Sequence, residues 1–291
     1  MLRVNIDSIS NENGRYYYRG GLFTGVAFFL NDCKVERSVE IKGGALHGEY
    51  FNEYLFGLDG LLKVDSDCLE PEDEGEEEPL CYGEERFSGI AYDFDDGFCT
   101  GELCYTRGWL GSQVGYYKSG ILGSIELIDE DFSQKIYWYE NGQIKRYEIF
   151  ERNSFDISLG FEENGEITVL SIDGDYFDRV GALRNKIKFY YFDDKKFSAE
   201  LTGADYLYVS GSAVDDELFD GLLANNGLSN TSKLRICRTP LTATSLEKLI
   251  PIKNIAELFV ESEALALEDL QNFKSQRPDC FVEFNREEVT V

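Results

Sequence analysis

Tyr137-Trp-Tyr-Glu-Asn-Gly-Gln-Ile-Lys145 is the clearest copy of a motif that recurs through the first part of this 291-residue chain. Three other segments end in the same way, and the four closing glycines are Gly97, Gly120, Gly142 and Gly165, at intervals of 23, 22 and 23 residues. Aromatic residues that alternate with polar ones are typical of half-buried strands, and Asn-Gly or Asp-Gly supplies the positive φ of a hairpin turn. The spacing therefore predicts a series of β-hairpins.

A second set of glycines follows a similar interval. Gly25 and Gly48 are 23 residues apart, and Gly89 and Gly111 are 22 residues apart. We interpret these glycines as the second turn of each hairpin unit. Successive units are then expected to pair edge to edge into an elongated antiparallel sheet, in which each repeat contacts mainly its neighbours.

These residues resemble the MORN repeat family, and in particular the bacterial MORN-type antitoxin proteins. The segment 137–145 is the closest copy, and Gly44-Ala-Leu-His-Gly-Glu-Tyr50 matches the other half of a unit. The likeness covers about residues 14–175 and is interrupted at 61–86. The resemblance implies a MORN-like β-repeat domain over residues 1–190, with an acidic insert at 61–86.

The insert contains the most acidic stretch of the chain. Residues 65–85 hold eleven acids and no base, including Glu76-Glu77-Glu78, and no hydrophobic period. This composition predicts a solvated or disordered loop inserted in the sheet. Two roles are open for the loop: it can keep the protein in solution passively, or it can attract a basic partner.

The last part of the chain repeats in a different way. Short alternating strands are predicted to start at 207, 234, 258 and 281, at intervals of 27, 24 and 23 residues, and helices are predicted at 243–249 and 264–273. The pattern resembles a bacterial leucine-rich repeat array, with the best match at 234–249. This resemblance implies an α/β domain over 200–291. The predicted fold class is therefore α+β: an elongated antiparallel β-hairpin repeat sheet (MORN-like) followed by a short leucine-rich-repeat-like solenoid.

Charge and composition limit the possible functions. The chain has 55 acids and 28 bases, a net charge of -27, and a single histidine, His47. Proteins that bind nucleic acids or anionic membranes carry a surplus of Lys and Arg on the binding surface. This chain has a surplus of acids, so neither is an expected partner. The sequence has neither a Gly-x-Ser-x-Gly motif nor a phosphate-binding loop. We therefore expect no enzyme activity, no cofactor and no metal site.

Cysteine usage and hydropathy predict a cytoplasmic protein. Seven cysteines form an odd, scattered set that lies mostly in apolar runs, which favours reduced, buried thiols over disulfides. No segment approaches the length of a transmembrane helix, and the first residues have no apolar core of a signal peptide.

An acidic repeat protein with many aromatic residues is best interpreted as a binder of a basic protein. The MORN-type resemblance sharpens this hypothesis to an immunity protein (antitoxin) that covers a basic toxin, for example a nuclease domain. The alternative is a cytoplasmic scaffold or adaptor. The candidate acidic contacts are Asp73, Glu74, Glu76, Glu77, Glu78, Glu261 and Glu263. The candidate aromatic contacts are Tyr137, Tyr139, Tyr206 and Tyr208, although at least half of these tyrosines are expected in the sheet core.

Overall fold

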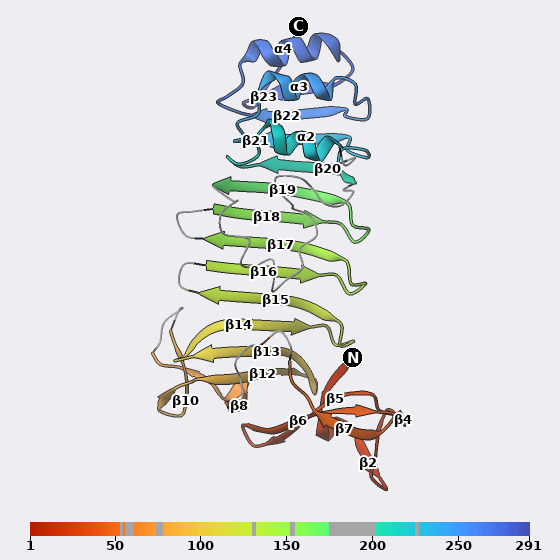
Figure 1. Cartoon of the computed structure of the whole chain (residues 1–291), viewed down its shortest axis with the longest axis vertical. Helices are drawn as coiled ribbons and strands as arrows, with labels where there is room; N and C mark the ends of the chain where they lie inside the picture. Colours follow the sequence, from red (N-terminus) through yellow and green to blue (C-terminus); the bar gives the residue numbers. More distant parts are fainter. Residues whose placement is uncertain are drawn as a thin grey trace. The chain divides into compact units, whose positions relative to one another are not determined.

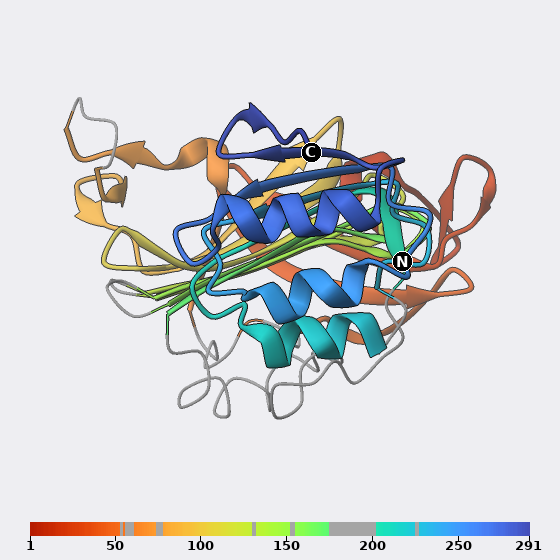
Figure 2. The same cartoon turned by 90° about the horizontal axis from the view of Figure 1, so that it is seen from above.

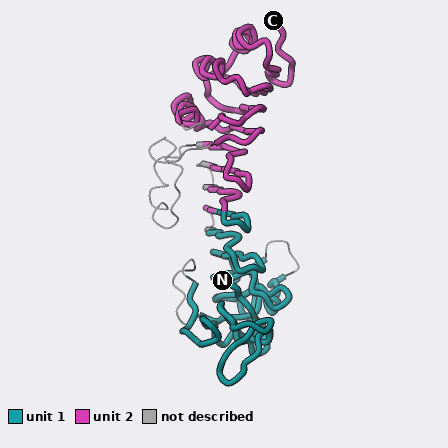
Figure 3. The backbone as a smooth tube through the Cα atoms, turned by 90° about the vertical axis from the view of Figure 1, so that its right-hand side faces the viewer, with its two compact units in different colours: residues 1–130, 135–142 teal, residues 131–134, 143–291 magenta. Residues whose placement is uncertain are grey.

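The computed structural model describes residues 1–52, 55, 61–73, 78–129, 132–151, 155–174, 202–224 and 227–291. The chain forms two compact units (Figure 3). Unit 1 comprises residues 1–130 and 135–142, and unit 2 comprises residues 131–134 and 143–291. The predicted boundary between domains, at 190–200, lies outside the described residues.

The predicted fold class is wrong. The structure is mostly β, with 52% strand and 13% helix, and its main element is one mixed sheet of 18 strands. A MORN-like hairpin sheet followed by a separate leucine-rich-repeat solenoid does not describe it. The reason lies in β19 (Ile167–Gly174), which pairs antiparallel with β18 (Phe155–Phe161) on one edge and parallel with β20 (Gly203–Ser210) on the other. The hydrogen-bonded ladder thus continues from antiparallel into parallel strands without a break.

Most of unit 1 is built from two copies of one structural motif, which span β1 to β14. The first copy contains β1 (Leu2–Asn5), the 3-10 turn η1 (Ile6–Ser8), β2 (Ser10–Glu12), β3 (Arg15–Tyr18), β4 (Gly21–Leu22), β5 (Gly25–Asn31), β6 (Lys34–Lys42) and β7 (Ala45–Glu49). The second copy contains β8 (Leu62–Asp65), η2 (Ser66–Cys68), β9 (Glu70–Pro71), β10 (Leu80–Tyr82), β11 (Glu85–Arg86), β12 (Gly89–Asp95), β13 (Phe98–Thr106) and β14 (Trp109–Tyr116). The order and type of the elements are the same in both.

Registers and hydrogen bonds match between the copies. The parallel pair β1–β5 aligns Leu2 with Gly25, and the parallel pair β8–β12 aligns Leu62 with Gly89. The backbone amide of Phe23 donates to a carbonyl of β3 at 2.9 Å, and the amide of its equivalent in the second copy donates to a carbonyl of β10 at 2.8 Å. Equivalent residues therefore differ in number by 60 before the β9–β10 connection and by 64 after it.

The two copies are interlocked as if by a two-fold axis. The backbone amide of Asn5 donates to the carbonyl of Gly97 in the other copy at 2.8 Å, and that of Asp65 donates to the carbonyl of Cys33 at 2.9 Å. Asn5 corresponds to Asp65, and Cys33 corresponds to Gly97. Each copy thus places its first strand beside the long hairpin of the other.

The acidic stretch belongs to this duplication. Sequence reasoning treated 61–86 as an interruption of the repeat, but the described residues of 62–86 form β8 to β11. The numbering difference between equivalent residues rises from 60 to 64 across the connection between β9 and β10, so the second copy is longer there. The acids are concentrated in this connection. Of this connection, 74–77 lie outside the described residues.

The hairpin turns follow the predicted glycine spacing. Gly97, Gly120, Gly142 and Gly165 all have positive φ, between 77° and 88°. These turns connect β12 with β13, β14 with β15 (Leu122–Asp129), β16 (Phe132–Trp138) with β17 (Ile144–Glu151), and β18 with β19. The predicted turns at Gly25, Gly48, Gly89 and Gly111 are wrong, because these four glycines lie in strands.

The described residues of unit 2 that follow β19 contain four parallel strands and three helices (Figure 1). The strands are β20, β21 (Lys233–Cys237), β22 (Glu257–Glu261) and β23 (Phe281–Phe284), and the short β24 (Glu287–Glu288) pairs antiparallel with β23. The helices α2 (Asp216–Ala224), α3 (Ala243–Leu249) and α4 (Leu267–Gln276) lie on one side of these strands (Figure 2). The predicted helix at 243–249 is confirmed, and that predicted at 264–273 is observed as α4, three residues further along the chain.

Alternation along the parallel strands explains which face is buried. Leu207, Leu234, Leu258 and Val282 are directly aligned across the four strands, and each is completely buried. The helices contribute buried Phe219, Leu249, Leu270 and Phe273. Side chains at the intervening strand positions point to the opposite face of the sheet.

Two of the seven cysteines are paired, contrary to the prediction of reduced thiols. Cys33 and Cys68 form a disulfide, whereas the other five are free. Sequence spacing could not reveal the pair, because the duplication brings the two residues together from different copies. None of the helices within the described ranges has the length and apolar character that a membrane span requires.

Candidate functional site

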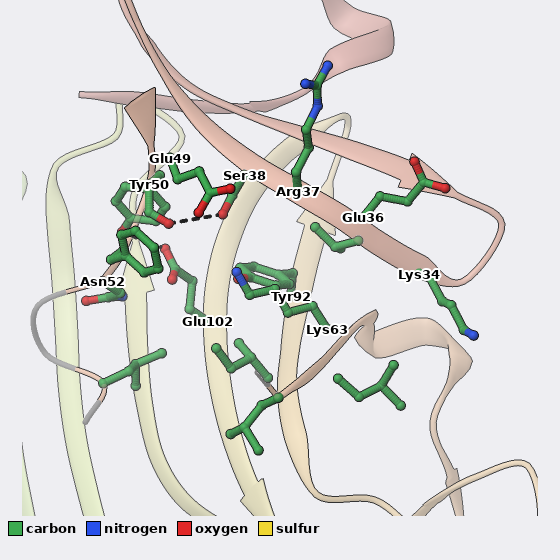
Figure 4. A pocket seen from close by; sticks show the side chains of 16 residues that line it. Lys34, Glu36, Arg37, Ser38, Glu49, Tyr50, Asn52, Lys63, Tyr92 and Glu102 are labelled. Atoms are coloured by element: carbon green, nitrogen blue, oxygen red, sulfur yellow. Dashed lines mark hydrogen bonds between the residues drawn. The ribbon is translucent and has the colours of Figure 1, made fainter. Parts of the chain in front are cut away.

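A cavity of about 680 Å³ lies in unit 1 between the two copies of the motif (Figure 4). Its lining comes from β6, the end of β7 and the segment that follows in the first copy, and from β8, β12 and β13 in the second. The charged and polar lining residues are Lys34, Glu36, Arg37, Ser38, Glu49, Tyr50, Asn52, Lys63, Tyr92 and Glu102.

Glu102 on β13 is the most deeply buried charged group of the cavity, with a side chain that is 1% exposed. Its carboxylate lies 3.5 Å from Nε of Arg3 and accepts a hydrogen bond from the hydroxyl of Tyr50 at 3.0 Å. The guanidinium of Arg3 lies 3.7 Å from the ring centre of Tyr116, in cation–π geometry. Burial raises the pKa of Glu102 despite these favourable partners.

The wall of the cavity is held by further hydrogen bonds. The Ser38 hydroxyl donates to the carbonyl of Tyr50 at 3.2 Å, as drawn in Figure 4. The amide of Asn52 donates to the hydroxyl of Tyr116 at 2.9 Å. Burial also raises the pKa of Tyr92, whose ring lies 5.0 Å from that of Phe28. The tyrosine hydroxyls therefore act as neutral hydrogen-bonding groups at physiological pH.

Unit 2 presents a second candidate site on the sheet face opposite the helices. Register aligns Tyr206, Lys233, Glu257 and Phe281 in one row across the parallel strands, and Tyr208, Arg235, Phe259 and Glu283 in the next. Tyr206 is 41% exposed and Phe281 is 38% exposed. We call these eight residues the open face of unit 2.

Ion pairs and ring contacts fix the side chains of the open face. The ammonium of Lys233 lies 2.7 Å from the carboxylate of Glu257 and 5.4 Å from the ring centre of Phe259. The Phe259 ring in turn lies 5.8 Å from that of Phe281. In the neighbouring row, Arg235 pairs with Glu261 at 2.6 Å. The rings of Phe259 and Phe281 therefore lie beside the ion pairs of Lys233 and Arg235.

The predicted contact residues are distributed over both units. Tyr206 and Tyr208 lie on the open face. Glu261 and Glu263 line one cavity of about 720 Å³ at the carboxyl ends of the parallel strands, together with Arg238, Thr239 and Asn285. The hydroxyl of Tyr137, which is half-buried, donates to Glu126 at 2.7 Å.

The remaining predicted residues are not brought together. Tyr139 is half-buried after the end of β16, Asp73 is exposed, and Glu78 is half-buried. Glu74, Glu76 and Glu77 lie outside the described residues. Sequence reasoning missed Arg3, Tyr50 and Glu102, which the duplication brings together from distant positions in the chain. A comparison of 1–50 with 61–114 is the sequence signal that could have revealed them.

Comparisons with known proteins identify no family. No protein-family model matches the chain, and no curated protein matches it. Three solved structures show weak likeness. The structure of accessory secretory protein 1, 2 and 3 in Streptococcus pneumoniae is 12% identical with a TM-score of 0.22, and the match covers 74% of this chain and 41% of that chain.

The GtfA/B complex bound to UDP and GlcNAc is 9% identical with a TM-score of 0.21, covering 76% of this chain and 64% of that chain. The glycosylation-associated protein (Gap123) complex from Streptococcus agalactiae is 14% identical with a TM-score of 0.14, covering 67% and 51%. Each match thus spans less than two thirds of the other chain. At such low TM-scores, these similarities support no inference about function.

Proposed function

We propose that this chain is a protein-binding protein whose recognition surface is the open face of unit 2. The observation that carries the proposal is a group of aromatic rings, the exposed Tyr206 and Phe281 and the half-buried Phe259, set among ion pairs on a regular sheet surface. Aromatic residues are enriched at the energetic centres of protein interfaces, and a surrounding polar rim excludes water from them. The parallel strands hold these side chains on a rigid scaffold.

We further propose that the partner is basic. The whole chain has a net charge of -27. On and beside the open face, Glu257, Glu283 and Glu261 lie among the cations Lys233, Arg235 and Arg286, so the expected attraction of a basic partner rests on the charge of the whole chain. A field of one sign accelerates association with a partner of opposite sign. In its sharpest form, the proposal is an immunity protein that occludes a basic toxin, a step that rests on the MORN-type resemblance of the sequence.

Co-expression tests the immunity role. The protein encoded beside this gene should be toxic when expressed alone, and the present chain should restore growth and form a stable complex with it. Neither protection nor a complex would reject the immunity role. Several non-toxic partners bound at the same surface would instead favour the scaffold role.

Substitutions on the open face test the surface. Tyr206→Ala combined with Phe281→Ala should weaken the complex about tenfold or more, because truncated interface aromatics remove large anchors. The matched control is Leu267→Ala, which removes an exposed apolar side chain (51% exposed) on the helix side of the same unit. Equal affinities of the double variant and the control would show that the open face is not the binding surface.

Salt dependence tests the charge of the partner separately. The association rate should fall steeply with ionic strength if the acidic field steers the encounter, while the dissociation rate changes little. A constant association rate would show that the charge of the chain does not steer the encounter. The role of the aromatic residues would then be tested by the substitutions alone.

We keep a cytoplasmic location as part of the proposal. The Cys33–Cys68 disulfide weighs against it, because disulfides persist mainly in oxidising compartments. Alkylation of thiols immediately on cell lysis would decide: seven labelled cysteines fit a reducing cytoplasm, whereas five labelled cysteines show that the disulfide exists in the cell.

A further inference from the structure

The duplication in unit 1 allows the residues of the cavity to be compared with their equivalents in the other copy. Arg3 on β1 is aligned with Val26, and Lys63 on β8 is aligned with Ile90 at the equivalent position, so Arg3 and Lys63 correspond. Glu102 on β13 corresponds in the same way to Ser38 on β6. In one half, Arg3 faces the carboxylate of Glu102. In the other half, Lys63 is matched with a short hydroxyl.

At the position equivalent to Glu102, Lys63 therefore meets a serine instead of a carboxylate. Within the described ranges, no ion pair forms at Lys63, and its ammonium lies 6.0 Å from the ring centre of Phe51. Its side chain lies along the cavity beside Tyr92 (Figure 4). Ser38, which is 3% exposed, places a shorter side chain at this position than Glu102 does in the other half.

The other charges around the cavity reinforce this asymmetry. Lys34 and Arg37 also line it, and neither forms an ion pair among the described residues; Arg37 stacks over Phe29 at 3.9 Å. The opposing carboxylates are Glu49 and Glu36, of which Glu36 accepts a hydrogen bond from Asn31 at 2.8 Å. With Glu102 matched by Arg3, three cations stand against two carboxylates among the lining residues that the structure describes. These cations lie in a chain whose net charge is -27.

We propose that this cavity binds a carboxylate group, which pairs with Lys63 as the carboxylate of Glu102 pairs with Arg3. Ser38 and Tyr92, which both line the cavity, lie beside this position. A volume of about 680 Å³ leaves room for the molecule that carries the carboxylate. The group can come from a small organic acid or from an acidic side chain of a bound peptide. The proposal concerns unit 1 and is independent of the open face of unit 2.

Titration with paired probes tests the chemistry. The probes are glutarate and its neutral diamide, and the blocked tripeptides acetyl-Gly-Glu-Gly-amide and acetyl-Gly-Gln-Gly-amide, followed by amide chemical shifts in β8 and β12. Saturable shifts are expected with an acid and none with its matched amide. Saturation by glutarate identifies free acids as the source, and saturation by the peptide alone identifies a presented side chain. If neither acid saturates, or if an amide binds as well as its acid, the proposal is wrong.

Two substitutions place the binding at Lys63. Lys63→Met should reduce carboxylate affinity at least tenfold, whereas Lys42→Met, which removes an exposed lysine of β6 outside the cavity, should leave it unchanged. Ser38→Glu should supply the missing carboxylate from within the chain and abolish binding of the probes. If Ser38→Glu does not fold, the two lysine variants still decide. Equal affinity in Lys63→Met and Lys42→Met would overturn the proposal.

Discussion

Cys33 and Cys68 form a covalent link between the two copies of the duplicated motif, with their Cα atoms 5.8 Å apart. Cys33 lies in the turn between β5 and β6, and Cys68 ends η2. Their equivalents in the other half are Gly97 and Ser8, and a side chain built at Gly97 would contact the hydroxyl of Ser8. The disulfide therefore occupies one of two equivalent contacts.

Removing the disulfide should destabilise unit 1. The two cysteines are 35 residues apart in sequence, and a cross-link that closes such a loop restricts the unfolded chain. We expect Cys33→Ser combined with Cys68→Ser to lower the free energy of unfolding by about 2–4 kcal/mol in denaturant titrations. A reductant should lower the stability of the wild type similarly and leave the double variant unchanged. Identical curves for all samples would contradict the disulfide.

The equivalent contact should accept a second disulfide. Ser8→Cys combined with Gly97→Cys places two thiols where the internal symmetry places Cys33 and Cys68. We expect the new pair to oxidise, so that the oxidised variant has four fewer alkylatable thiols than the fully reduced variant, two for the native disulfide and two for the new one. The gain in stability should be smaller than that from the native pair, because Gly97 has φ of 77°, where a side chain is strained. Persistence of both new thiols under oxidising conditions would contradict the two-fold arrangement.

Equivalent glycines should respond equally to substitution. A Cβ at Gly25 would meet the carbonyl of Leu2 and the ring of Phe23, and a Cβ at Gly89 would meet the matching groups of the second copy. Gly25→Ala and Gly89→Ala should each lower the free energy of unfolding by about 1–3 kcal/mol through overpacking. Gly48→Ala is the control, since no atom lies within 4 Å of its added Cβ. A loss at only one of the two sites would argue against equivalence.

The glycines also show which parts of the fold can be predicted from the sequence. The interval from Gly97 to Gly165 correctly predicted hairpin turns, because φ > 0 at a turn selects glycine directly. Gly25 and Gly89 gave the same signal for a different reason: a strand and an aromatic ring approach them closely. A glycine in a sequence does not distinguish these causes, so the duplication was mistaken for part of a shorter repeat.

The candidate sites were harder to predict. The sequence predicts Tyr206 and Tyr208 as aromatic contacts, and alternation along β20 places both on one face. Arg3 and Glu102 were not named, because their meeting depends on how the two copies interlock. Pairing between distant strands is a property of the whole sheet and leaves no local pattern.

Glu102 should make stability depend on pH. Because burial raises its pKa, the folded chain holds the proton of this carboxyl more tightly than the unfolded chain does. Stability from that proton is fully present below the unfolded pKa, and it is lost as the pH rises through the folded pKa. Relative to Glu102→Gln, which cannot titrate, the wild type should therefore lose free energy of unfolding as the pH rises above about 4.5.

Urea titrations of both proteins across this pH range measure the difference, in which the effects of the other acids largely cancel. Glu36→Gln, an exposed rim residue, reports the effect of removing one negative charge. A wild type that gains stability relative to Glu102→Gln with rising pH would show that the ion pair with Arg3 outweighs burial.

Arg277 should be the most sensitive charged residue of unit 2. It is the C-cap residue that follows α4, and it is completely buried. Its guanidinium donates to the carbonyls of Ile252 and Ile255, both at 2.7 Å, and to Asp279 at 3.1 Å. A planar guanidinium can serve three acceptors at once, whereas a lysine ammonium at the end of a shorter chain cannot reach the same set.

Arg277→Lys should therefore leave buried carbonyls unpaired and lower the free energy of unfolding by about 2–4 kcal/mol. Arg286→Lys makes the same change at a side chain that is 82% exposed, and it should alter stability by less than about 0.5 kcal/mol. Denaturant unfolding followed by helical circular dichroism compares the two, since the helices belong to unit 2. Equal stability of both variants would mean that water replaces the guanidinium at these carbonyls, and that the loop at 250–256 does not depend on Arg277 for its position.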